Sequence, residues 1–488
     1  MALEEAKIKE REGYDVFFVL CDKSVGVCHP NSYCSKQMCI FCKYTMMKLI
    51  KPLLSNSHYH CVSISSLITE HDKEIIQNIK FDYSTVEELK SIEFHGVEVG
   101  YGAFSNYVSS SRNIMPDFTP EFHEYIDYII RSEVLMTICL ERYINKINPN
   151  LMIFHNGRFS NVKAMLWLSK INKIDYIATE TYSSKNGVMM KNNSHNDIPH
   201  SQKAQREKIE LAWEHCGAIE GTNIGKTFFL NKKMSKPAGD KVYTKDQKMG
   251  KLPADFDAKK RNISIFNSSE DEMFSISREY DNTVLFPNQF IALKTIFDHY
   301  KDDKTVHFYL RIHPNLATVP YKSHTLLYEL KYENVTIIPP KSDISSYALM
   351  DSSEKVIVFN STMGVESSYW GKAVIALGKD FYTSYNIVHQ PKTIEQVYEM
   401  IDNPKLECLR DETSCYKLAC YQMGYGTDDF IYYKVTSKLE NFCGRPINTY
   451  SCFKFFNSEK IHRLIELTLM GLALLNPKCR MYYRLASN

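Results

Sequence analysis

The chain has 488 residues, of which 44% are hydrophobic and 24% charged. This length is greater than one hydrophobic core usually supports, so we expect two domains of roughly 200 residues each. The 59 basic and 57 acidic residues leave a formal net charge of +2, which excludes the strongly basic footprint typical of nucleic-acid binding. The N-terminus lacks the apolar core of a secretory signal. The longest apolar run, 467–475, has about nine residues, whereas a bilayer span needs about 20. We therefore expect a cytoplasmic protein, peripheral to the inner membrane at most.

Strand and helix patterns alternate in the first 200 residues. The apolar run 15–21 predicts a first buried strand, and 119–145 predicts a helix that covers one side of a sheet. Strand 151–154, a helix and strand 174–178 then make a βαβ unit. We expect residues 1–200 to form a Rossmann-like domain on the acceptor side.

Cysteines crowd the first predicted strand and the loop that follows it. Cys39 and Cys42 have Cys-x-x-Cys spacing, which lets two thiolates reach one metal ion, and Cys21 and Cys28 would complete a tetrahedral set. One interpretation is a structural Zn or Fe–S site on these four residues. The other is a group of buried free thiols, because cysteine is among the most buried residue types.

A polar, lysine-rich stretch separates the two halves of the chain, and we place the connection at 201–260. Strict alternation of strands and helices over 261–445 then predicts a doubly wound parallel sheet. The predicted strands are 262–266, 306–312, 335–338, 355–359 and 373–377. The predicted fold class is therefore α/β, with two Rossmann-like doubly wound domains that face a cleft.

Residues that directly follow strands have the strongest functional interest, because doubly wound sheets bind ligands beyond the carboxyl ends of their strands. Arg311 and His313 end the second predicted strand of this domain. Arginine offers a planar fork to phosphate oxygens, and histidine can donate to the same anion or to a leaving group. The alternative is a strand-end turn with solvated charges.

A second polar turn follows the strand 355–359. Ser361, Thr362 and Gly364 open a helix whose exposed amides favour an anion, with glycine allowing close approach of a ligand. Glu366, one turn later, is placed to accept hydrogen bonds from sugar hydroxyls. An ordinary capped helix is the simpler interpretation of this turn alone. Its position one βαβαβ step from Arg311 favours a nucleotide-sugar pocket.

These motifs together resemble a known family. Arg311-Ile-His-Pro, Ser345-Ser-Tyr and Ser361-Thr-Met-Gly-Val-Glu366 are similar to the donor half of GT-B glycosyltransferases from capsule and lipopolysaccharide gene clusters, and more remotely to Kdo- and sialic-acid-transferring enzymes. The resemblance covers about 262–382. It implies that the donor is bound by Arg311, His313, Ser346, Ser361, Thr362, Gly364 and Glu366, with His313 also acting in catalysis.

The first domain supplies candidates for the acceptor side. His155, Asn156 and Arg158 directly follow one predicted strand, and Glu180 ends the next. The resemblance places Asn156 and Arg158 near the acceptor. An inverting transfer needs a base for the acceptor hydroxyl, and Glu180 and His155 are the candidates. The alternative is that Arg158 and Glu180 form an ion pair that braces the sheet edge.

The last segment, 446–488, carries apolar residues at helical spacing from 459 to 475. Such a helix crosses back to pack on the first domain or lies on an anionic membrane. The sequence thus predicts a glycosyltransferase that uses a nucleotide-sugar donor and a lipid-linked or oligosaccharide acceptor and requires no cofactor for transfer. The alternatives are a nucleotide-sugar 2-epimerase and a non-catalytic carbohydrate-binding subunit of a polysaccharide assembly complex.

Overall fold

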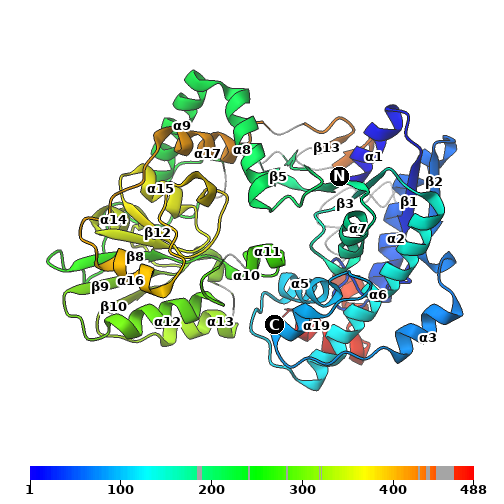
Figure 1. The fold of residues 1–488 in the computed structure, drawn as a ribbon, viewed down its shortest axis with the longest axis horizontal. Coiled ribbons are helices and arrows are strands. Elements are labelled where there is room, and N and C mark those ends of the chain that lie inside the picture. The colour runs from blue at the N-terminus through cyan, green and yellow to red at the C-terminus, as the bar shows by residue number, and fades with distance from the viewer. Residues whose placement is uncertain are drawn as a thin grey trace. The chain divides into compact units, whose positions relative to one another are not determined.

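The computed structural model describes residues 1–183, 189–239, 242–281, 284–317, 319, 321–426, 429–435, 440–446 and 467–487. The chain divides into two compact units, each described by itself (Figure 1). Unit 1 comprises Met1–Thr181, Met189–Pro199 and Asp428–Asn488, and unit 2 comprises Tyr182–Val188 and His200–Thr427. The stretch predicted as a connection, 201–260, thus lies in unit 2, because its helices pack on the core of that unit.

Unit 2 is built on a five-stranded parallel sheet in the order β10-β9-β8-β11-β12. The chain adds β9 and β10 on one side of β8 and then crosses back to add β11 and β12 on the other. Ligands of such sheets bind where the order reverses, here between β8 and β11. The strands are β8 (Arg261–Phe266), β9 (Val306–Arg311), β10 (Val335–Ile338), β11 (Lys355–Val358) and β12 (Ala373–Ala376).

Helices cover both faces of this sheet, as Figure 1 shows for α15 and α12. Val356 and Val358 of β11 pack into one apolar core and Ile357 into the other, because successive strand residues point to opposite faces. The doubly wound α/β prediction is therefore confirmed for this unit. Its helices are α8 (Gln202–Cys216), α9 (Ala218–Lys233), α10 (Glu270–Met273), α11 (Arg278–Asp281), α12 (Gln289–Tyr300), α13 (Lys322–Thr325), α14 (Ser346–Ser352), α15 (Met363–Tyr369), α16 (Ile394–Asp402) and α17 (Glu412–Gln422).

The strands of unit 1 form smaller sheets. β1 (Val16–Leu20) pairs in parallel with β2 (Tyr59–Ser63), and β3 (Leu151–His155) pairs in parallel with β4 (Asp175–Thr179), with α7 (Ser160–Ile171) between them. The predicted βαβ unit is thus present. β1 itself is less buried than predicted, with Phe17 39% exposed, because it belongs to a sheet of two strands. The remaining short strands are β5 (Thr181–Ser183), β6 (Met189–Lys191), β7 (Ser194–His195), β13 (Tyr433–Val435), β14 (Glu440–Phe442) and β15 (Arg445–Pro446).

A long helix organises unit 1. α6 (Pro120–Ile147) starts where the Thr119 hydroxyl accepts a hydrogen bond from the Phe122 amide, and more than half of its residues are buried. α19 (Pro477–Ser487) packs on α5 and α6, and its Tyr482 is fully buried. The predicted helix 459–475 falls partly outside the described residues. The other helices are α1 (Ala2–Arg11), α2 (Lys36–Ile50), α3 (Glu70–Asn78), α4 (Val86–Ser91) and α5 (Val99–Ser111). None of the helices in the described ranges is long and apolar enough to span a bilayer.

Candidate functional site

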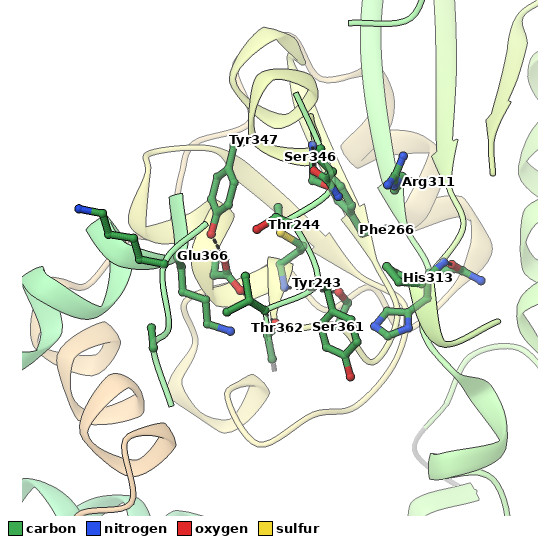
Figure 2. Close-up of a pocket in the computed structure, with 18 residues that line it drawn as sticks. Tyr243, Thr244, Phe266, Arg311, His313, Ser346, Tyr347, Ser361, Thr362 and Glu366 are labelled. Atoms are coloured by element: carbon green, nitrogen blue, oxygen red, sulfur yellow. Dashed lines mark hydrogen bonds between the residues drawn. The ribbon is translucent and has the colours of Figure 1, made fainter. Parts of the chain in front are cut away.

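A pocket of unit 2 lies at the carboxyl edge of its sheet, at the point where the strand order reverses. The hollow opens to solvent, and the empty space between its walls, open solvent included, is about 670 Å³. Its walls come from the end of β8, the end of β9, the start of α14 and the turn after β11. Figure 2 shows Arg311 and His313 on one side and Tyr347 with Glu366 on the other.

Arg311, the last residue of β9, is buried with 3% of its surface exposed. One nitrogen, Nη2, donates to the Ser342 carbonyl at 3.0 Å, while Nε and Nη1 have no hydrogen-bond partner. Burial lowers the pKa of Arg311 to about 10, so the guanidinium stays charged at neutral pH. A buried cation with two unused donors is costly unless an anion reaches it.

Asn267, directly after β8, supplies a third unused donor. Its Oδ1 accepts the His313 backbone amide at 2.7 Å, and its Nδ2 is buried without a partner. The His313 ring accepts the Asn315 amide at Nδ1 over 3.2 Å. A neutral imidazole that accepts at Nδ1 carries its proton on Nε2 and can donate from there. Arg311, Asn267 and His313 therefore line the pocket with hydrogen-bond donors.

The turn after β11 holds a carboxylate in place. Glu366 is buried, and its two oxygens accept hydrogen bonds from the Tyr347 hydroxyl and from the Thr362 hydroxyl, the latter at 3.0 Å. Ser361 and Thr362 line the pocket with Glu366, as predicted from the sequence. Ser346, at the start of α14, also lines it and donates its amide to the Gln247 side chain at 2.7 Å.

Gly364 has a packing role that the sequence did not predict. It does not line the pocket, and a Cβ there would lie 2.2 Å from the Tyr382 hydroxyl. Tyr382 is fully buried and donates to the Ser361 carbonyl at 2.7 Å. The glycine therefore makes room for a tyrosine that braces the turn.

One wall of this pocket was not predicted from the sequence. Its residues come from α9 and the stretch after it, which polar composition had assigned to a connection. Tyr243 packs edge-on against His313, with ring centroids 5.1 Å apart. A lysine-rich stretch beside a glycine turn gives little sign that it returns to the sheet. The missed residues are Lys232, Lys236, Tyr243, Thr244 and Gln247, with Tyr347 of α14.

The acceptor-side candidates of unit 1 lie together at the ends of β3 and β4. Asn156 Nδ2 donates to Glu180 Oε2 at 3.1 Å and lies 3.3 Å from His155 Nε2. His155 Nδ1 lies 3.0 Å from the Thr179 carbonyl, and Arg158 Nε donates to the Ser105 hydroxyl at 2.9 Å. Four predicted residues thus share one hydrogen-bonded cluster.

His29 is a member of this neighbourhood that the sequence analysis did not identify. Its ring stacks on Phe159 with centroids 3.8 Å apart, and Nε2 lies 2.9 Å from the Ser109 hydroxyl. Burial, followed by the charges of Arg158 and His155, lowers the pKa of His29 to about 4. The ring is therefore neutral at physiological pH.

The cysteine cluster gives no support to the metal interpretation. Across the described ranges, no group of three or more His, Cys, Asp or Glu side chains is arranged to hold a metal ion, Cys21 and Cys42 included. Cys39 Sγ accepts a hydrogen bond from Asn31 at 3.2 Å, and burial raises the pKa of Cys28 to about 12. All four cysteines are free thiols, but Cys21 and Cys42 are exposed and Cys28 and Cys39 are half-buried, so the burial expected in the alternative interpretation is wrong.

Part of the chain is similar to a known protein family. Residues 242–422 match the family model described as capsule polysaccharide biosynthesis protein, which confirms the resemblance predicted from the sequence over this stretch. No curated protein matches the chain.

Solved structures resemble the chain only remotely. The β-Kdo 2,4-transferase KpsC of Thermosulfurimonas dismutans is 13% identical with a TM-score of 0.36, covering 64% of this chain and 86% of its own. The β-Kdo 2,7-transferase KpsC of the same organism is 13% identical with a TM-score of 0.33, covering 67% and 89%. MnaA of S. aureus, solved with UDP, is 11% identical with a TM-score of 0.26, covering 83% and 93%.

Proposed function

We propose that the chain is a glycosyltransferase of surface-polysaccharide synthesis that moves a sugar from a nucleotide-activated donor to a lipid-linked or oligosaccharide acceptor. The observation that carries the proposal is Arg311, a buried cation with two unused donors in a pocket at the switch point of a doubly wound sheet. The match of residues 242–422 to capsule polysaccharide biosynthesis proteins supports the polysaccharide context.

In this proposal the unit 2 pocket binds the donor. Arg311 and the Asn267 amide bind phosphate oxygens, and His313 donates from Nε2 to the leaving phosphate as negative charge develops. Ser361 and Thr362 add hydroxyl donors. Glu366, fixed by Tyr347 and Thr362, accepts from a ribose or sugar hydroxyl. Arg311 thus supplies the charge that a divalent cation supplies in metal-dependent transferases.

The acceptor is bound by unit 1 in the same proposal. Asn156 and Arg158 contact the acceptor, and either His155 or Glu180 takes the proton of its attacking hydroxyl. A His155 ring that donates Nδ1–H to the Thr179 carbonyl has its lone pair on Nε2, which faces the Asn156 amide at 3.3 Å, so the acceptor hydroxyl would have to displace this contact. Glu180 already accepts from Asn156 and from the Thr181 amide at 2.9 Å.

The test is nucleotide release from UDP-, GDP-, dTDP- and CMP-sugars by the purified protein, with and without oligosaccharide acceptors. We expect one donor to be turned over in an acceptor-stimulated manner, and Arg311→Ala to lose this turnover. Epimerised sugar without transfer would replace the proposal with the epimerase alternative. Donor binding without any turnover would favour the non-catalytic alternative.

A further inference from the structure

The last described residues of unit 1, 467–487, form two short helices joined by a turn, which we call the C-terminal helix pair. The chain is helical at 467–473, and α19 follows from Pro477. Ala473 of the first helix and Cys479 of α19 are buried. One side of each helix is therefore packed against the unit, and the other side is exposed.

The exposed side of the first helix is apolar. Leu467, Leu472 and the following Leu475 are 51%, 49% and 71% exposed. At 3.6 residues per turn, Leu467 and Leu472 both lie on the part of the helix that faces away from the buried Ala473. A cluster of exposed leucines, unlike a single one, indicates an interaction surface.

The exposed side of α19 is cationic. Arg480 and Arg484 are exposed and lie one helical turn apart, away from the buried Tyr482. Arg480 Nε donates to the Leu474 carbonyl at 3.0 Å, which places this guanidinium directly beside the leucines. The whole chain is nearly balanced in charge, yet none of its 57 acidic residues lies within 467–487. The excess of cations is therefore local to this surface.

The start of α2 extends the cationic surface. Tyr33, just before α2, packs edge-on against Tyr483 of α19 with ring centroids 5.8 Å apart, so the first turn of α2 lies beside α19. The sequence of α2 contains no acidic residue. Its exposed side chains include Lys36 and Lys43, with Ile40 55% exposed between them. The same combination of apolar and cationic side chains is thus present on both elements.

We infer that the C-terminal helix pair binds an anionic lipid surface, with Leu472 and Leu475 among the acyl chains and Arg480 and Arg484 at the headgroup phosphates. Exposed leucines beside cations, with no acid in the same stretch, are the features of a helix that lies on an anionic membrane. A second copy of the chain would bring like charges together across a two-fold axis. A nucleic acid would pair with the arginines but leave the leucines exposed.

This surface goes beyond the proposed function. It would hold the protein where a lipid-linked acceptor resides, but vesicle binding requires neither the donor pocket nor turnover. A failure of vesicle binding would therefore leave the proposed sugar transfer untouched, and a failure of transfer would leave the lipid surface untouched.

The experiment measures sedimentation of the full chain with vesicles of phosphatidylcholine, with and without phosphatidylglycerol. We expect about tenfold or more tighter binding to the anionic vesicles, and a loss of this difference at high salt. Arg480→Gln/Arg484→Gln should lower binding to anionic vesicles about tenfold or more. Leu472→Asn/Leu475→Asn should lower it about tenfold or more through lost apolar contact. Both variants should keep the melting temperature of the unmodified chain, because these side chains are exposed.

Matched controls come from exposed positions of unit 2. Lys203→Gln/Lys226→Gln removes the same amount of charge, and Leu211→Asn removes a leucine that is 52% exposed. Both should bind vesicles as the unmodified chain does. Lys478 is left unchanged, because it pairs with Glu124 at 2.9 Å.

Three results would overturn the inference. The first is equal binding to both vesicle compositions, or binding to neither. The second is binding to anionic vesicles that survives the arginine and leucine substitutions. The third is a dimer that forms without vesicles and dissociates in Leu472→Asn/Leu475→Asn, measured by analytical ultracentrifugation, which would assign the surface to a second copy of the chain.

Discussion

The two units use strands of similar length in different environments. β9 of unit 2 is buried at every residue, between apolar cores on both faces of a five-stranded sheet. β1 of unit 1 has no fully buried residue and belongs to a sheet of two strands. An apolar run therefore predicts a strand but not how deeply the strand is buried, because burial depends on the number of neighbouring strands and helices.

The comparison extends to the polar residues at the strand ends. In unit 1, the polar groups after β3 and β4 bond to one another, as Asn156 does with Glu180. In unit 2, Arg311 and Asn267 retain unused donors although they are buried. This difference supports the proposal that the edge of unit 2 binds a ligand, whereas the cluster of unit 1 is internally hydrogen-bonded to a greater extent.

The largest effect is expected from Arg311→Met. Two charge-assisted hydrogen bonds to the donor would be lost, and donor turnover should fall about 100-fold or more. Stability should be unchanged or raised, because a buried and incompletely bonded charge is removed. Steady-state turnover and thermal unfolding of the same preparation check both parts. A variant that keeps its activity would remove the distinction between the two strand edges.

The next test compares two leucines. Leu310→Ala in β9 removes a fully buried side chain and should lower the free energy of unfolding by about 2–5 kcal/mol. Leu20→Ala in the partly exposed β1 should cost about 1 kcal/mol or less. Urea unfolding followed by circular dichroism measures the free energy of unfolding of both variants. Equal losses would show that β1 is as well packed as β9.

A smaller effect is expected at Gly364. Gly364→Ala places a Cβ 2.2 Å from the Tyr382 hydroxyl and should cost about 1–3 kcal/mol through overpacking. Gly471→Ala is the control in unit 1, where a Cβ meets nothing within 4 Å; it should be neutral or slightly stabilising in a helix. Melting temperatures of the two variants give the comparison. A harmless Gly364→Ala would mean that Tyr382 does not brace the turn.

The smallest effect concerns pH. Burial raises the pKa of Glu270 to about 8 from an ordinary value of 4.5, and burial raises that of Asp380 to about 7. The folded state therefore holds these protons more tightly than the unfolded state, so stability falls as pH rises from about 4.5 through 8. We expect a melting temperature a few degrees lower at pH 9 than at pH 6.

Glu270→Gln should remove part of this pH dependence, since Asp380 retains its own contribution. The exposed Glu399 on α16 of the same unit is the control, and Glu399→Gln should leave the slope unchanged. Thermal unfolding at four or five pH values between 6 and 9 measures the slope of melting temperature against pH for each variant. A slope that Glu270→Gln does not alter would place the titration elsewhere.

Much of unit 2 could be predicted from the sequence. Its five strands are short apolar runs separated by helix patterns, and parallel strands buried on both faces give that signal directly. Arg311, His313, Ser361, Thr362 and Glu366 could be found because they follow those strands. The role of Gly364 could not, because it depends on Tyr382, which is distant in sequence and is placed only by the fold.

The pocket wall formed by α9 and the residues after it could not be predicted from the sequence. Lys232 and Lys236 reach the pocket only because α9 packs on α15 through Phe229 and Tyr369. Such a long-range contact leaves no local pattern. The Cys-x-x-Cys spacing is the opposite case, a clear local pattern for which the described part of the chain shows no group of three or more ligands around one point.

The segmented make-up of unit 1 has a consequence for biosynthesis. Unit 1 draws on Asp428–Asn488 as well as on Met1–Thr181 and Met189–Pro199. Tyr482 of α19 lies against Tyr125 of α6 with ring centroids 5.0 Å apart. During translation, residues 200–427 of unit 2 emerge from the ribosome before that last segment exists. The second unit can therefore fold first, while the first unit waits for the final stretch of the nascent chain, reversing the usual N-to-C order of domain folding.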